Sequence, residues 1–272
     1  MPALHFLSDY GLVDEFVGVV HAVLHRRAPG VPVIDLTHQI PAFDVAAGGA
    51  ALARAAPHLG SGVVLAVVDP GVATARRGLA VGLGPGPGPA WMVGPDNGLL
   101  IPALEVLGGA EVAYQLAGGT GSTFDGRDLF APAAAHLITG GHPAQLGSRI
   151  EAGTLVSAPP TPPDRVVGTT VVTAVAWVDA FGNVQLRAGP ELLDGLGIPG
   201  GRIEVRGEPP GSVPALTARR VTAFAELAPG ELGLLVDASG RLALVVDRGS
   251  AADVLGLGPH GPAPTVRLTP AP

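Results

Sequence analysis

Short aliphatic runs alternate with amphipathic segments over the first half of the chain. The amphipathic segments, at residues 14–27, 45–56, 98–107 and 128–139, have the hydrophobic spacing of helices. The aliphatic runs predict buried strands at residues 3–7, 31–36, 62–68, 78–82 and 90–93. Because strands and helices alternate, we expect an α/β domain with a mainly parallel sheet covered by helices.

A Pro-rich stretch separates this half from a region with a different pattern. Residues 157–164 read SAPPTPPD, a composition typical of a linker between domains. Beyond it, short strand-like segments are separated by Gly and Pro turns, at residues 171–178, 184–187, 202–205, 231–236, 242–246 and 265–268. We therefore predict an α/β domain over residues 1–160 and an all-β domain over 161–272, built as a small antiparallel barrel or sandwich.

Polar residues follow three of the predicted strands in the first domain. Asp9 comes after the first strand, His38 after the second and Asp69 after the third. In α/β sheets, ligands bind beyond the carboxyl ends of the strands. We therefore expect these three side chains to lie at one edge of the sheet and to mark a site.

Two missing residue types narrow the chemistry that such a site can perform. All 16 basic residues are Arg, and the chain contains no Cys. The absence of Lys excludes a P-loop lysine and a Schiff base, and the absence of Cys excludes thiolate nucleophiles, iron–sulfur clusters and Cys-ligated zinc. The formal net charge of −7 argues against a nucleic-acid partner.

The hydrophobic runs also bear on the location of the protein. None approaches the roughly 18–20 residues that span a bilayer. The first residues reach Asp9 without a basic segment, so we expect neither a membrane span nor a signal peptide. Together with the lack of Cys, this favours a cytoplasmic protein.

One pair of histidines has the spacing of metal ligands. His21 and His25 lie four residues apart on a predicted helix, but the sequence shows no third ligand for them. We therefore interpret the pair as structural and expect no metal site.

Several short motifs occur in an order that one protein family shares. They are LSDYG at 7–11, DEFVG at 14–18, DLTHQIP at 35–41, VDPGV at 68–72, GPDNG at 94–98, TFDGRD at 123–128, FGN at 181–183 and GSAA at 249–252. Over nearly the whole chain, this series resembles the S-adenosyl-L-methionine (SAM) hydroxide adenosyltransferase family, which is related to SAM-dependent fluorinases and chlorinases.

The resemblance implies an architecture and a reaction. It implies an N-terminal α/β domain joined to a C-terminal β-barrel, in a homotrimer whose active sites lie between one subunit's N-domain and its neighbour's C-domain. The implied reaction is the hydrolysis of SAM to adenosine and L-methionine, by attack of an activated water at ribose C5′. Neither a metal nor an added cofactor is expected.

The resemblance also assigns roles to individual residues. Asp69 and Arg76 match two members of the family's water-activating Asp/Arg/His set: Asp69 would orient or deprotonate the water, and Arg76 would stabilise the developing hydroxide. Substrate contacts are expected from Asp9 to the ribose hydroxyls, Asp179 to the methionine ammonium, Ser239 to its carboxylate, Asn183 to the adenine edge, Phe224 to the adenine face, and from Arg248.

The sequence departs from the family pattern at one catalytic position. The family's histidine precedes Gly-Arg-Asp, and here that position is Asp125. A carboxylate can replace the imidazole as base or water acceptor. Because Asp69 and Arg76 both remain, we expect hydrolysis to be retained, with Asp125 as the third catalytic residue. The alternatives are a SAM-dependent halide transferase, which forms a 5′-halo-5′-deoxyadenosine, and a non-catalytic protein that binds SAM or adenosine.

Overall fold

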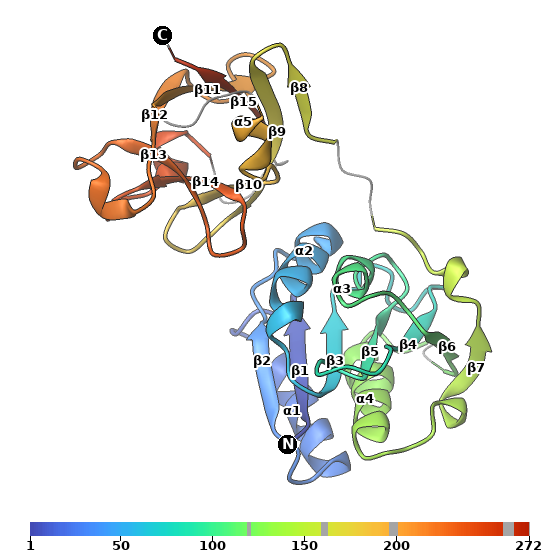
Figure 1. Cartoon of the computed structure of the whole chain (residues 1–272). Coiled ribbons are helices and arrows are strands. Elements are labelled where there is room, and N and C mark those ends of the chain that lie inside the picture. Colours follow the sequence, from blue (N-terminus) through green and yellow to red (C-terminus); the bar gives the residue numbers. More distant parts are fainter. Residues whose placement is uncertain (119–120, 159–162, 196–200, 258–263, 272) are drawn as a thin grey trace. The chain divides into compact units, whose positions relative to one another are not determined.

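The chain folds into two compact units, Met1–Pro160 and Thr161–Pro272. The structure is a computed structural model and describes residues 1–118, 121–158, 163–195, 201–257 and 264–271 (Figure 1). Each unit has its own hydrophobic core. Within the described residues, none of the helices combines the length with the apolar character that crossing a bilayer requires.

The N-terminal unit is built on a mixed sheet with the strand order β2-β1-β3-β5-β4-β6-β7. The strands β2, β1, β3 and β5 are parallel, and β4, β6 and β7 continue the sheet with antiparallel pairings. Their bounds are β1 Ala3–Ser8, β2 Val33–Thr37, β3 Gly62–Val67, β4 Gly78–Gly82, β5 Trp91–Pro95, β6 Val112–Leu116 and β7 Gly147–Ile150. The expected α/β class is confirmed, with the parallel strands in one half of the sheet.

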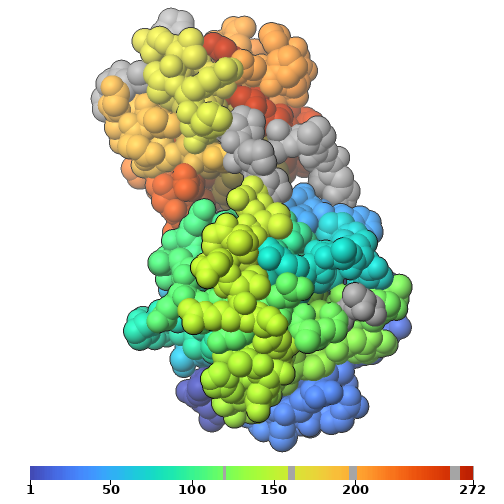
Figure 2. Space-filling model, turned by 90° about the vertical axis from the view of Figure 1, so that its right-hand side faces the viewer, coloured from blue at the N-terminus to red at the C-terminus, as the bar shows by residue number. Residues whose placement is uncertain are grey.

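Helices cover both faces of this sheet (Figure 1). Helices α1 (Phe16–Arg27) and α4 (Ala131–Ile138) pack on one face, and α2 (Val45–Ala55) and α3 (Ile101–Val106) on the other. Strand residues alternate between the two cores, as the period-two geometry of a strand requires: Val63 and Leu65 face α1 and α4, whereas Val64 and Ala66 face α2 and α3. The segment after α4, which contains β7, spreads over one side of this unit in Figure 2.

The C-terminal unit is a closed, mostly antiparallel barrel. Strand β10 pairs with both β14 and β9, which joins the two ends of the order β10-β14-β13-β12-β11-β15-β9, and β8 extends the sheet beyond β9. The bounds are β8 Arg165–Val167, β9 Thr170–Val178, β10 Val184–Leu186, β11 Arg202–Glu208, β12 Leu216–Arg220, β13 Leu232–Val236, β14 Leu242–Val246 and β15 Thr265–Pro270, with short helices α5 Glu191–Asp194 and α6 Ala251–Val254. Of the two predicted architectures, barrel and sandwich, the structure shows the barrel.

Short helical turns connect several of these elements. A π-helix at Gly126–Phe130 leads directly into α4, and 3₁₀ turns lie at Ala56–His58, Pro143–Gln145, Ala152–Thr154 and Phe224–Glu226. The helical segment thus begins before Asp128, where the sequence pattern had placed its start. Asp128 accepts hydrogen bonds from Arg127, at 2.7 Å, and from Ser122.

Candidate active site

Asp69 lies just beyond the carboxyl end of the central strand β3. Strand β3 is completely buried, and the side chain of Asn97 donates a hydrogen bond of 2.9 Å to the carbonyl oxygen of Val68, next to Asp69. A sharp turn follows, in which Val72 N–H donates to the carbonyl of Asp69 at 3.3 Å. Through Asn97, the GPDNG motif therefore fixes the strand end that carries Asp69.

Arg76 joins two carboxylates into one buried cluster. Its Nε donates to Asp69 Oδ1 at 3.0 Å, and its Nη2 donates both to Asp69 Oδ2 and, at 2.7 Å, to Asp125 Oδ2. The side chains of Asp69, Arg76 and Asp125 are only 6%, 8% and 2% exposed. The structure thus brings together the three side chains that the sequence analysis assigned to water activation.

The guanidinium of Arg76 is held tightly in this arrangement. Nη1 donates to the carbonyl of Arg77 at 3.3 Å, and the guanidinium carbon lies 5.2 Å from the centroid of the Phe130 ring, a cation–π contact. Four of the five N–H bonds that a guanidinium offers are therefore directed at protein acceptors. Most of the donor capacity of Arg76 goes into positioning the two carboxylates.

Asp125 has one oxygen that the protein leaves unused. Oδ2 accepts from Arg76, whereas Oδ1 is buried and makes no hydrogen bond with any residue that the structure describes. A buried carboxylate oxygen without a donor is costly, and a bound water is the usual way in which a protein satisfies it. The cluster therefore offers an acceptor for one water beside Asp69 and Arg76.

Tyr10 packs against the same segment. A Cβ atom at Gly126 would lie 2.0 Å from the Tyr10 hydroxyl oxygen, so only glycine permits this approach. Burial raises the pKa of Tyr10, and the negative charges of Asp9, Asp69 and Asp125 raise it further. The phenol therefore stays protonated as a hydrogen-bond donor near the carboxylates. Sequence reasoning missed Tyr10 as a site residue, although it belongs to the LSDYG motif.

The electrostatics of the cluster favour a proton acceptor. Burial raises the pKa of Asp69 above its ordinary value, and the neighbouring charge of Asp125 acts in the same direction, against the opposing effect of Arg76. Two carboxylates share one guanidinium, so the cluster carries an excess negative charge when both are ionised. A base whose pKa lies closer to neutrality transfers protons more effectively at physiological pH.

Asp9 lies at the same edge of the sheet, after β1. Its Oδ2 accepts a hydrogen bond of 2.9 Å from the backbone N–H of Phe43, and burial raises its pKa. Ser8 Oγ and His38 Nδ1 are 2.8 Å apart, which joins the ends of β1 and β2. Because β1 pairs in parallel with both β2 and β3, Asp9, His38 and Asp69 follow strands that end at the same edge of the sheet, and their role as a site stays a prediction.

The C-terminal unit contains a separate hollow lined by predicted substrate contacts. The hollow has a volume of about 540 Å³, within the usual range for small-molecule pockets, and is lined by Phe181, Asn183, Phe224, Val246, Asp247, Arg248 and Gly249. Phe181 and Phe224 are both exposed, which leaves their rings accessible for stacking. Among the residues named from the sequence, Asn183, Phe224 and Arg248 come together here.

Asp179 has a structural task that the sequence did not reveal. Its Oδ1 accepts from the backbone N–H groups of Phe181 and Asn183, both at 2.9 Å. Its Oδ2 accepts from the side chains of Asn183, at 2.8 Å, and Gln185, at 3.3 Å. Asp179 thus fixes the loop that presents Asn183, and its predicted contact with the methionine ammonium remains a prediction.

Ser239 stands apart from this group in the structure. It lies in the turn between β13 and β14, where its backbone N–H donates to Asp237 Oδ1 at 2.8 Å, and its side chain is exposed. It is not among the residues that line the hollow. Its predicted contact with the substrate carboxylate also remains a prediction.

Comparisons with known proteins agree with these features in both units. The family model described as SAM hydroxide adenosyltransferase N-terminal domain matches residues 4–147, and the model of the C-terminal domain matches residues 173–263. An (R)-S-adenosyl-L-methionine hydrolase from Salinispora tropica is 44% identical over 264 residues, covering 95% of each chain. A fluorinase from Nocardia brasiliensis is 26% identical and covers 92% of each chain. A crystal structure of a conserved protein from Thermotoga maritima superposes with a TM-score of 0.85, at 30% identity, over 98% of this chain and 99% of the other.

The chain is thus a two-domain protein. Its α/β unit holds the buried cluster of Asp69, Arg76 and Asp125, and its barrel holds a hollow lined in part by Phe181 and Phe224. Both of its units match the corresponding family models. The chain therefore belongs to the SAM hydroxide adenosyltransferase family.

Proposed function

We propose that the protein hydrolyses S-adenosyl-L-methionine to adenosine and L-methionine. The observation that carries the proposal is the unused Asp125 Oδ1, buried beside the Asp69–Arg76 ion pair. That oxygen supplies a fixed acceptor for a water, and Asp69 supplies a second carboxylate with a raised pKa. The similarity to an (R)-S-adenosyl-L-methionine hydrolase over 95% of the chain supports the choice of substrate.

The reaction is a displacement at a single carbon. The water oxygen bonds to ribose C5′ while the bond between C5′ and the sulfonium sulfur breaks, and its electron pair leaves with the sulfur as neutral methionine. The leaving group needs no proton, so the enzyme has only to orient the water and accept its proton. Asp125 Oδ1 directs the water, Asp69 takes the proton, and Arg76 keeps the two carboxylates in place.

The remaining predicted contacts bind the two ends of the substrate. Asp9 is proposed to accept hydrogen bonds from the ribose hydroxyls. The hollow of the barrel, which Arg248 helps to line, is proposed to take the adenine, with Phe224 stacking on its face and Asn183 contacting its edge. Asp179 and Ser239 are proposed to contact the methionine end. In this proposal residues 1–160 form the catalytic domain, residues 161–272 complete the site of a neighbouring subunit in a homotrimer, and the protein is cytoplasmic.

The charge of the cluster argues against the halide transferase alternative. Halide ions are anions, and two buried carboxylates on one guanidinium repel them. A neutral water, by contrast, gains hydrogen bonds from the same carboxylates. The relationship to fluorinases, at 26% identity, nevertheless makes halide the right competitor to test.

The experiment is chromatography of the reaction products. The purified protein is incubated with SAM of each sulfonium configuration, first without halide and then with fluoride, chloride or bromide. We expect adenosine and methionine in equal amounts in every buffer. Because the Salinispora relative is an (R)-S-adenosyl-L-methionine hydrolase, we expect the (R) form to be the preferred substrate.

The same assay distinguishes the alternatives. A 5′-halo-5′-deoxyadenosine would contradict hydrolysis and support halide transfer, and ligand that stays intact over hours would support a non-catalytic binder. As a control, Asp69→Asn should lower kcat by about 100-fold or more while leaving KM nearly unchanged, because a general base acts in the transition state.

A further inference from the structure

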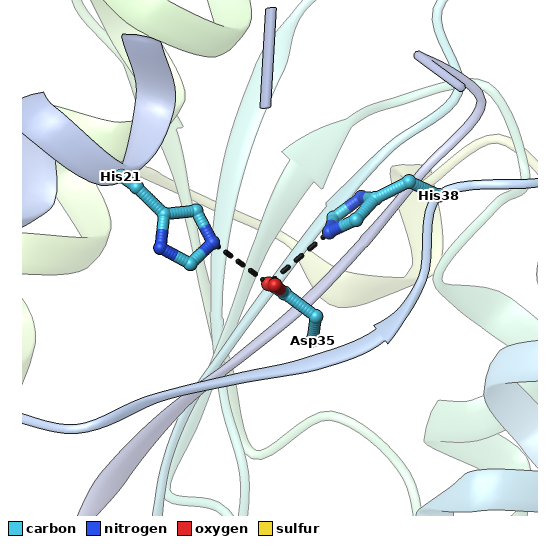
Figure 3. A group of neighbouring side chains, drawn as sticks. All are labelled: His21, Asp35 and His38. Carbon is cyan, nitrogen blue, oxygen red and sulfur yellow. Dashed lines mark hydrogen bonds and ion pairs between the residues drawn. The ribbon is translucent and has the colours of Figure 1, made fainter. Parts of the chain in front are cut away.

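Three side chains with metal-binding atoms meet at the edge strand of the N-terminal sheet (Figure 3). Asp35 belongs to β2, His38 follows the same strand directly, and His21 comes from helix α1. Figure 3 shows the Asp35 carboxylate between the two imidazole rings. His21 Nε2 is 2.8 Å and His38 Nε2 is 3.1 Å from the same oxygen, Asp35 Oδ1.

Hydrogen bonds among the three side chains do not account for the buried Nε2 of His38. Its side chain is only 3% exposed, and its Nε2 makes no hydrogen bond within the described part of the chain, although Asp35 Oδ1 lies at ion-pair distance. Polar nitrogens buried in this way normally have a partner. The ring directs this nitrogen towards the carboxylate and the second imidazole, so a ligand between the three groups would satisfy it.

Neighbouring side chains hold the His38 ring in place, in the way that the ring of a metal-bound histidine is usually held. Its other nitrogen, Nδ1, lies 2.8 Å from Ser8 Oγ, and a hydrogen bond to the second nitrogen is the usual support of a metal-bound imidazole. The Phe6 ring packs edge-on against His38, with centroids 4.5 Å apart, and against His21 at 6.1 Å. His38 therefore offers one buried nitrogen on a ring that its neighbours hold in place.

We propose that His21, Asp35 and His38 bind a divalent transition-metal ion of the zinc class. Two imidazole nitrogens and one carboxylate oxygen suit zinc, cobalt or nickel, and they disfavour magnesium and calcium, which prefer oxygen ligands. Water completes the coordination, because His21 and Asp35 are 34% and 42% exposed and leave the site open to solvent.

The geometry is compatible with such an ion after small movements. The three ligating atoms lie within 4.8 Å of one another. Bonds of about 2.0–2.2 Å in a tetrahedral arrangement place ligand atoms roughly 3.3–3.5 Å apart. The distances of 2.8 and 3.1 Å from Asp35 Oδ1 to the two imidazole nitrogens therefore have to widen by about half an ångström, and His21 has to adopt the same spacing from His38. The partial exposure of His21 and Asp35 permits these movements.

The ion would stabilise a segment next to the proposed active site. The carbonyl of His38 accepts a hydrogen bond of 2.7 Å from Gly11 N–H, and Ser8, which contacts the His38 ring, precedes Asp9. A metal that fixes His38 therefore also fixes the chain that carries Asp9 and Tyr10. No step of the proposed hydrolysis passes through the ion, so the two proposals can fail independently.

The test is metal binding to the full-length protein. After dialysis against a chelator, the protein is titrated with Zn²⁺ in a calorimeter, its metal content is measured after gel filtration, and its Tm is recorded with and without Zn²⁺. We expect one zinc per chain and a Tm that rises with the zinc concentration, because the ion binds the folded state. Asp35→Asn and His21→Gln, at partly exposed positions, should each remove the stoichiometric binding and the shift in Tm.

His25→Gln is the matched control, since His25 lies on the same helix and is exposed. This variant should bind zinc as the unaltered chain does. If His25→Gln lost the zinc while Asp35→Asn kept it, the ion would belong to the His21–His25 pair and the proposal would be wrong. Absence of stoichiometric binding to the unaltered chain would also overturn it and leave a hydrogen-bonded cluster.

Discussion

Asp125, a carboxylate where the family pattern has a histidine, gives the candidate active site its particular character. Burial raises the pKa of Asp69, the neighbouring Arg76 guanidinium acts against this, and the negative charge of Asp125 raises the pKa further. The proposed proton acceptor, Asp69, and the proposed water ligand, Asp125, are therefore electrostatically coupled. Two changes at position 125 separate these roles.

Asp125→Asn should shift the pH profile of the reaction. Asp69 acts as a base only when it is ionised, so kcat/KM should rise with pH through the raised pKa of Asp69. Removing the charge of Asp125 takes away one cause of that raised pKa, so the rising limb should move to lower pH. The measurement is kcat/KM between about pH 4 and 9 for both proteins. A limb that stays in place would show that Asp125 does not act on the base.

Asp125→His should retain or improve hydrolysis. The imidazole is the group that the family pattern places before Gly-Arg-Asp, and it can accept a hydrogen bond from water as Asp125 Oδ1 does. Steady-state kinetics test this, with Tm as the check on folding. A variant that is folded but inactive would show that the cluster requires a carboxylate here.

At the scale of elements, the π-helix at Gly126–Phe130 positions the cluster. It begins directly after Asp125 and leads into α4, and its glycine allows the Tyr10 hydroxyl to approach the backbone. A wider π-turn at this point is in keeping with the frequent occurrence of such turns at functional sites. The position of Asp125 thus depends on a contact between the first strand's loop and a helix more than a hundred residues later.

Gly126→Ala should disturb this contact measurably. The new Cβ would lie 2.0 Å from the Tyr10 oxygen, so the ring or the helix has to shift, at a cost of about 1–3 kcal/mol in stability and with a lower kcat. Gly18→Ala is the control, because position 18 also lies in a helix and has no atom within 4 Å of the added Cβ. Thermal melts and kinetics measure both effects.

A second substitution tests the cause. Tyr10→Phe removes the oxygen that collides with the new Cβ, so it should restore part of the stability that Gly126→Ala loses. Additive losses in the double variant would contradict a direct contact.

The sequence predicted most of the elements around the site, for a physical reason. The strands that carry Asp9 and Asp69 are buried on both faces and therefore read as continuous aliphatic runs. It did not predict β6, β7, β8 and β12, which contain polar residues such as Gln115, Arg149 and Arg219 and so lack that signal.

The sequence predicted the candidate site only in part, again because only local patterns can be read from it. Motif order was sufficient to bring Asp69, Arg76 and Asp125 together, since each lies in a recognisable segment. Contacts between distant segments left no local pattern. For this reason Tyr10 against Gly126, the four hydrogen bonds of Asp179, and Asp35 beside His21 were all missed.

At the scale of the whole molecule, the proposed reaction needs residues from both units. The water-activating cluster belongs to residues 1–160, and the hollow with Asn183 and Phe224 belongs to residues 161–272. A homotrimer with shared sites would combine the cluster of one chain with the hollow of the next. Light scattering on the purified protein tests the number of chains, and complementation tests the sharing.

Complementation uses two variants that are each inactive for a different reason. Asp69→Asn lacks the base, and Asn183→Ala with Phe224→Ala lacks the adenine contacts. In trimers that assemble at random from equal amounts of both chains, about a quarter of shared sites receive an intact cluster from one chain and an intact hollow from its neighbour. Co-expressed chains, purified through two different tags, should therefore regain a substantial fraction of the unaltered activity. If every site were formed within one chain, each site would keep one defect and the co-expressed chains would stay inactive. As the control, the two variants purified separately and mixed without subunit exchange should also be inactive.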